Sequence, residues 1–166
     1  CDKAALLADP DIDLILISAV PADRADLAIA AMRSGKDVMS DKPGCTTLAQ
    51  LDAIRAAQEE TGRIWSIDFS ERFEVPAMTR AAELVAEGAI GRVVQFFDRA
   101  RYGGILTDIG SHQIDQFLFL TGSTDATVLR AYVANYANPT HPGLQDFGEI
   151  VLQSGDAHGY IRVDWY

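Results

Sequence analysis

The first recognisable pattern in the sequence is Ile12-Asp13-Leu14-Ile15-Leu16-Ile17-Ser18-Ala19-Val20-Pro21. The run up to Val20 is mostly apolar, as expected of a strand buried on both faces of a sheet. Pro21 suits the first position of a helix, because the N–H that it lacks would have no partner there. Residues 22–34 predict that helix, with Gly35 as its stop. The stretch therefore predicts a strand that leads directly into a helix.

Working outward, strands and helices keep alternating up to about residue 70. Asp37–Ser40 predicts a short strand, and Thr47-Leu48-Ala49-Gln50 is a capping-box pattern that opens a helix to Thr61, ended by Gly62. Residues 63–69 predict another strand. Helices between strands imply right-handed crossovers and a parallel sheet covered on both faces. We expect residues 1–70 to form part of an α/β, Rossmann-like domain.

The regular alternation of strands and helices ends after about residue 70. A helix is predicted over 76–87 and another over 105–120, with strands over 92–98, 127–136, 147–153 and 159–166. The last two strands form a predicted hairpin across residues 154–158. Because few helices remain, we expect residues 71–166 to form an α+β domain with a largely antiparallel, open sheet.

The second of these helices contains the motif Gly103-Gly104-Ile105-Leu106-Thr107-Asp108-Ile109-Gly110-Ser111-His112-Gln113-Ile114-Asp115. Helical spacing places Asp108, His112, Asp115 and Phe119 on one stripe, while apolar residues fill most of the remaining circumference. A helix that is apolar nearly all round is buried, so the stripe is predicted to face a cleft. The alternative is that the stripe is the solvated side of a surface helix.

A second motif, Asp41-Lys42-Pro43-Gly44, follows the strand over 37–40. Pro43 ends the strand, because it has no N–H for a sheet and restricts φ. In open α/β sheets, ligands bind beyond the carboxyl ends of the strands, where a lysine can reach a substrate hydroxyl or carbonyl. Taken alone, Lys42 fits an ordinary solvated lysine better than a catalytic one.

Together, these motifs resemble the Gfo/Idh/MocA oxidoreductases, which have a strand followed by Glu/Asp-Lys-Pro and, later, Gly-Gly-x-x-x-Asp-x-Gly-x-His-x-x-Asp. The resemblance extends over nearly the whole chain and includes residues 13–21, 34–38 and 87–93. It implies an enzyme that transfers a hydride between NAD or NADP and a hydroxyl or carbonyl carbon of a sugar, inositol or related polyol. Two alternatives within the superfamily are an NAD-dependent glycoside hydrolase and a non-catalytic dinucleotide-binding regulator.

The resemblance also implies roles for particular residues. The catalytic set is Lys42, Asp108 and His112, with His112 as the base, Asp108 holding the imidazole or the substrate hydroxyl, and Lys42 stabilising charge on the reacting oxygen. The cofactor-binding set is Ser18, Ala19, Val20, Pro21, Asp41, Lys42 and Pro43. The substrate-binding set is Arg72 and Asp115.

The chain departs from the family pattern in three places. No Gly-x-Gly-x-x-Gly loop follows a strand, so we expect this sequence to be a fragment without the N-terminal phosphate-binding loop. Ala22 and Ala25 stand where the family often has Asn and His. Only four residues separate Asp98 from Gly103, where relatives have a longer segment, which predicts a break in the chain.

Composition narrows the classes of function. The 166 residues carry a formal net charge of −10, which argues against nucleic-acid and anionic-membrane binding. No run approaches the roughly 20 apolar residues of a membrane span. Cys1 and Cys45 give neither a disulfide framework nor metal-ligand spacing, and the three histidines lie far apart, so no metal is expected. We expect a soluble, cytoplasmic protein with a small-molecule partner, forming a homo-oligomer through its apolar C-terminal strands.

Overall fold

The computed structural model describes residues 2–100, 109–143 and 145–164. The chain divides into two compact units, Cys1–Asp68 and Phe69–Tyr166. The expected break between Asp98 and Gly103 falls on residues 101–108, which lie outside the described residues.

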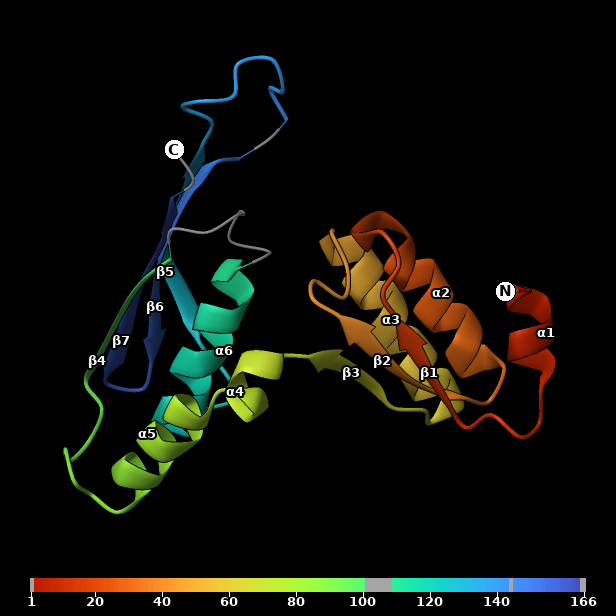
Figure 1. Ribbon diagram of the computed structural model, residues 1–166, viewed down its shortest axis with the longest axis horizontal. Helices are drawn as coiled ribbons and strands as arrows, with labels where there is room; N and C mark the ends of the chain where they lie inside the picture. Colours follow the sequence, from red (N-terminus) through yellow and green to blue (C-terminus); the bar gives the residue numbers. More distant parts are fainter. Residues whose placement is uncertain (1, 101–108, 144, 165–166) are drawn as a thin grey trace. The chain divides into compact units, whose positions relative to one another are not determined.

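The first unit is a parallel sheet with helices between its strands (Figure 1). Its strands lie in the order β1-β2-β3, and Val38 is in register with Ile15 on one side and Trp65 on the other. The elements are α1 (Lys3–Ala8), β1 (Leu14–Ile17), α2 (Pro21–Arg33), β2 (Asp37–Asp41), α3 (Leu48–Thr61) and β3 (Trp65–Asp68). The predicted partial Rossmann-like sheet is confirmed.

The helix ends of this unit follow their local sequence. Pro21 occupies the first turn of α2, as predicted. The Thr47 hydroxyl accepts a hydrogen bond from the Gln50 amide at 3.2 Å, which caps α3. The Gln50 side chain accepts from the Thr46 amide at 2.8 Å, one residue before the position that a capping box would use. Gly62 ends α3 at φ 64°, a left-handed conformation that glycine adopts without strain.

The core of the first unit lies on one face of the sheet. The buried side chains here are Ile17, Ala25, Ala28, Ala31, Met32, Val38, Ile54 and Ala57. The expectation of a sheet covered on both faces is wrong for the described residues, because Leu14, Leu16 and Met39 are exposed. The physical reason is the strand order: successive right-handed crossovers that advance in one direction place their helices on the same face.

The second unit is an open sheet with helices on one side (Figure 1). Its strands lie in the order β4-β7-β6-β5; β4 pairs with β7 in parallel, and the other two pairings are antiparallel. The elements are α4 (Ser70–Glu74), α5 (Pro76–Ala86), β4 (Gln95–Ala100), α6 (Ile109–Thr121), β5 (Thr127–Ala134), β6 (Phe147–Ser154) and β7 (Ala157–Asp164). The predicted open, largely antiparallel sheet is confirmed, whereas α4 was not expected.

Helix α6 packs on the sheet through Phe117, which is fully buried. The cluster around it consists of Ile150, Leu152, Ala157 and Ile161, with Phe96, Ile114, Leu118 and Ala126 at its border. Gly159 allows the close approach, since a Cβ there would lie 3.1 Å from Cγ and Cδ2 of Phe117. Phe117 therefore sets how closely α6 approaches β7.

The opposite face of this sheet is open, and much of β5 is exposed. Tyr132 and Tyr160 are exposed on this face, whereas the exposed Val128 and Val133 share the face of Ile150 and Leu152, on which α6 packs. Leu129 and Tyr136 are also exposed. Ile150, Ile161 and Val163, apolar residues of the C-terminal strands that we expected to form an oligomer surface, are buried. No helix in the described part of the chain is long and apolar enough to cross a membrane.

Candidate active site

The first candidate region is the carboxyl edge of the parallel sheet. Strands β1, β2 and β3 end there at Ile17, Asp41 and Asp68. A hollow of about 150 Å³ lies at this edge, lined by Leu16, Ile17, Ser18, Met39, Asp41 and Asp68. It combines apolar walls with one hydroxyl and two carboxylates, a donor and acceptor set that suits a polar ring with an amide.

The predicted cofactor residues form the two turns at this edge. Ser18, Ala19 and Val20 connect β1 to α2, and Pro21 begins the helix. Asp41, Lys42 and Pro43 follow β2, and the Lys42–Pro43 peptide bond is cis. The structure thus brings together the whole cofactor set that the sequence predicted.

The two turns are joined by Arg24, a residue that the sequence analysis did not single out. Arg24 is only 5% exposed. Its Nε donates to the Ala19 carbonyl at 2.7 Å, across the β1–α2 turn. Its Nη1 donates to the carbonyls of Asp41, Lys42 and Pro43 at 2.9, 2.6 and 2.9 Å. A buried guanidinium therefore holds the backbone on which Lys42 is placed.

Asp41 completes this arrangement. Its Oδ2 accepts from Arg24 Nη2 at 3.1 Å, and its Oδ1 accepts from the Lys42 amide at 2.8 Å. Gly44 lets the turn lie against β3, since a Cβ there would overlap Ile67 Cδ1 and lie 2.6 Å from Trp65 Cζ2. The Lys42 side chain is half-buried. The backbone of its turn is held by hydrogen bonds with Arg24 and Asp41 on one side and by the packing of Gly44 against β3 on the other.

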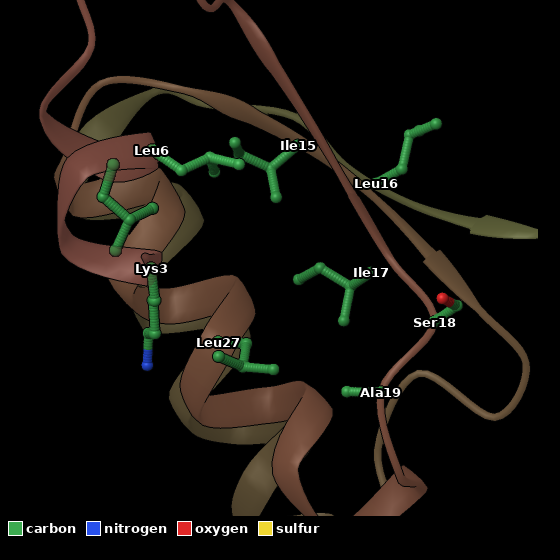
Figure 2. Close-up of a pocket in the computed structure, with 9 residues that line it drawn as sticks. Lys3, Leu6, Ile15, Leu16, Ile17, Ser18, Ala19 and Leu27 are labelled. Atoms are coloured by element: carbon green, nitrogen blue, oxygen red, sulfur yellow. The ribbon is translucent and has the colours of Figure 1, made fainter. Parts of the chain in front are cut away.

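A second hollow in this unit, of about 220 Å³, has a different character. Figure 2 shows Ile15 and Ile17 pointing from β1 toward Leu27 of α2, with Leu6 of α1 beside them and Leu16 on the other side of the strand. Of the described residues that line it, Lys3 and Ser18 are polar and the other seven are apolar. A phosphate needs several donors, so this hollow suits an apolar group.

The second candidate region is helix α6, where His112 is 5% exposed. Its ring lies edge-on to Phe69, with centroids 6.1 Å apart. Within the described residues, His112 Nδ1 is buried without a hydrogen-bond partner, as are Trp65 Nε1 and Gln113 Oε1. Such an unsatisfied atom costs about 1–3 kcal/mol. An imidazole with a buried, unpaired ring nitrogen is a candidate for proton transfer.

The rest of the polar stripe on α6 faces α4. Arg72 Nε donates to Asp115 Oδ2 at 2.8 Å, and Arg72 Nη2 donates to Asp115 Oδ1. The guanidinium also lies 4.8 Å from the centre of the Phe119 ring. Where we expected an open cleft, Arg72 covers the stripe at Asp115 and Phe119. The two residues predicted to bind substrate are thus paired with each other.

Asp108, the third predicted catalytic residue, lies outside the described residues. One turn after His112 on α6, Gln116 Nε2 donates to Glu71 Oε2 at 2.7 Å, which is a second hydrogen-bonded link between α4 and α6. Arg24 stood in a predicted helix and Glu71 in a segment with no predicted helix, and neither had a further sequence signal, because both contact segments distant in the sequence.

Among the described residues, two groups have shifted pKa values. Burial raises the pKa of the Cys45 thiol, so it is less reactive than an ordinary cysteine. At Asp146, burial acts against ionisation, but hydrogen bonds from the Tyr136 and Ala137 amides and the Asn138 side chain outweigh it and lower the pKa. Asp146 thus anchors the loop after β5. Among the described residues, no group of three His, Cys, Asp or Glu side chains could hold a metal ion.

Two family models match the chain. Residues 1–69 match a model described as an oxidoreductase family with an NAD-binding Rossmann fold. Residues 94–166 match the model of the GFO/IDH/MocA C-terminal domain. The two models fall on the two units of the structure.

Three individual proteins are similar to the chain over nearly its whole length. The crystal structure of a provisionally designated oxidoreductase from Erwinia carotovora atroseptica has a TM-score of 0.89 and 44% identity, covering 98% of this chain and 54% of that one. Levoglucosan dehydrogenase of Pseudarthrobacter phenanthrenivorans is 29% identical, over 97% of this chain and 44% of its own. The scyllo-inositol 2-dehydrogenase (NAD(+)) of Bacillus subtilis is 29% identical, over 98% and 48%. The chain spans about half the length of these relatives.

Proposed function

This chain belongs to the Gfo/Idh/MocA oxidoreductase family, and from that premise we propose that its protein transfers a hydride between NAD or NADP and a carbinol or carbonyl carbon of a polyol. The observation that carries the proposal is the buried imidazole of His112, whose Nδ1 has no partner within the described residues. The names of the levoglucosan and scyllo-inositol dehydrogenases support sugars and inositols as the substrate class.

The residues at the carboxyl edge of the first sheet fit a nicotinamide cofactor. The hollow there has apolar walls at Leu16 and Ile17 and polar groups at Ser18, Asp41 and Asp68. We assign Ser18 to Pro21 and Asp41 to Pro43 to this cofactor. When bound, it supplies the acceptor for the hydride that leaves the carbinol carbon.

The hydroxyl proton requires a base within hydrogen-bond reach. We assign this role to the imidazole of His112, oriented by Asp108, which stands one helical turn earlier in the sequence. Lys42 donates to the reacting oxygen and stabilises the charge that develops on it. Arg72 and Asp115 position the stripe of α6, and the remaining donor capacity of Arg72 serves the substrate.

Turnover of the full-length protein tests this proposal. We expect reduced nicotinamide to accumulate with at least one sugar, inositol or other polyol in a panel. His112→Ala and Lys42→Ala should each lower kcat by about 100-fold with little change in cofactor affinity, the loss expected for a general base or a charge stabiliser. His158→Ala, a half-buried histidine on β7, is the matched control and should keep parent activity. Normal kcat in His112→Ala from pH 6 to 9 would exclude that base, and glycoside release without net reduction would indicate a hydrolase.

We also propose that the protein is a homo-oligomer through the open face of the second sheet. The exposed Tyr132 and Tyr160 support this, because aromatic side chains on one open face favour association. Light scattering on the full-length protein tests it: Tyr132→Glu should shift the mass toward the monomer, and an unchanged mass would exclude this face.

A further inference from the structure

The β1–α2 turn and the β2–α3 turn meet at the carboxyl edge of the first sheet, and the guanidinium of Arg24 lies between them. We propose that Arg24 is a positioning residue for Lys42, setting the direction in which the lysine side chain leaves its turn. This inference rests on the proposed function of Lys42, and the experiment below separates failure of one from failure of the other.

The hydrogen bonds act on both peptide planes that flank the Lys42 Cα. The Asp41 carbonyl belongs to the peptide before Lys42, and the Lys42 carbonyl to the peptide after it. Arg24 Nη1 donates to both, at 2.9 and 2.6 Å. When both planes are held, φ and ψ of Lys42 are held too, and they set the direction of its Cα–Cβ bond. Arg24 thus acts on Lys42 through the backbone of its turn.

The side chain of Asp41 closes the arrangement from the amide side. Its carboxylate accepts from Arg24 Nη2 at 3.1 Å and from the Lys42 N–H at 2.8 Å. The same group therefore balances the buried guanidinium charge and fixes the amide of the lysine. This explains why a cation that is only 5% exposed is tolerated here.

Only arginine can make this set of contacts. Its planar fork directs Nε to Ala19 on one turn while Nη1 and Nη2 reach the other turn. A lysine at position 24 would keep the charge, but its single nitrogen cannot serve acceptors on both sides. The fork ties the turn that we assign to the cofactor to the turn that presents Lys42.

The experiment is a double-mutant cycle on kcat in the full-length protein. Arg24→Lys should lower kcat by about 10-fold or more, with cofactor affinity within about 3-fold of the parent. Arg33→Lys is the matched control, because Arg33 lies on the same helix but forms an exposed pair with Glu60. It should leave kcat unchanged. In a Lys42→Ala background, Arg24→Lys should change kcat by less than about 2-fold, since residues that act through one another are not additive.

Three outcomes would overturn the inference: an unchanged kcat in Arg24→Lys, an equal loss with and without Lys42, or a loss confined to cofactor affinity. If Arg24→Lys does not fold, Asp41→Asn replaces it in the cycle, because it removes the ionic partner of Arg24 and keeps every backbone carbonyl. The same loss of kcat, masked by Lys42→Ala, is then expected, and additivity would again refute the inference. Parent-level kcat in Lys42→Ala alone would instead refute the proposed function.

Discussion

The contact between Phe117 and Gly159 should determine how well α6 packs on its sheet, and a pair of substitutions of opposite size tests this. A Cβ at position 159 would lie 3.1 Å from two ring atoms of Phe117 and 3.3 Å from a third. Carbon atoms prefer separations of about 3.5–4.0 Å, so the ring must withdraw by roughly half an ångström. Overpacking of this kind costs about 1–3 kcal/mol, and we expect Gly159→Ala to lie near 2 kcal/mol.

At about 2–4 °C per kcal/mol for a protein of this size, Gly159→Ala should lower Tm by roughly 4–8 °C. Phe117→Leu alone should cost about 1–2 kcal/mol, because it leaves a partly filled cavity. The double variant should be more stable than the sum of the single effects predicts by about 1 kcal/mol, because the smaller side chain makes room for the methyl group.

Scanning calorimetry of the four proteins measures this coupling. Gly143→Ala is the control, since a Cβ there meets no atom within 4 Å, and Tm should stay within about 2 °C of the parent. Additivity of the two substitutions within about 0.3 kcal/mol would show that the ring and the glycine do not limit each other, and the account of how α6 is seated would be wrong.

Three more predictions concern the Arg72–Asp115 pair, Asp146 and Gly44. Arg72→Leu should lower stability to urea by about 2–4 kcal/mol, because it leaves the buried Asp115 carboxylate unpaired, and adding Asp115→Leu should recover most of that loss; no recovery would argue against the pair. The pKa of Asp146 is lowered in the folded protein, so its contribution to stability is present above about pH 4 and is lost as the pH falls through its folded-state pKa. Asp146→Asn should therefore have a lower Tm than the parent at pH 7, and the difference in Tm should close below about pH 4. Gly44→Ala should lower kcat by about 10-fold, because its methyl group would overlap Ile67 and displace the Lys42 turn, and a kcat equal to that of the parent would contradict this.

The elements with strong local signals could be predicted from the sequence. Pro21 begins α2 and Gly62 ends α3, because each meets a backbone requirement that is decided within a few residues. Helix α4 has only five residues and is held by contacts of Arg72 and Glu71 with α6. Five residues are too few to show a helical periodicity, and the contacts that hold the helix join segments that are far apart in the sequence.

The residues of the candidate site also differ in whether the sequence alone could indicate them. Lys42 and His112 could be proposed from the sequence because their neighbours form recognisable motifs. Arg24 was not, because between Asp23 and Ala25 it looks like any arginine on a helix surface, and its acceptors lie in turns that only folding brings together. The sequence placed Asp115 on the right face of its helix but could not show that Arg72 occupies that face.

The parallel pairing of β4 with β7 makes the second unit dependent on the most distant part of its own chain. Gln95 in β4 has His158 in β7 as its partner, so the strand that precedes the His112 helix is the neighbour of the last described strand. During synthesis, β1, β2 and β3 can pair early, whereas β4 must wait for β7, and α6 must wait for Ile161 and Gly159 to cover Phe117. Until then, Phe117 and Phe96 are apolar surface without a cover, and a nascent chain halted before β7 is a candidate for chaperone binding.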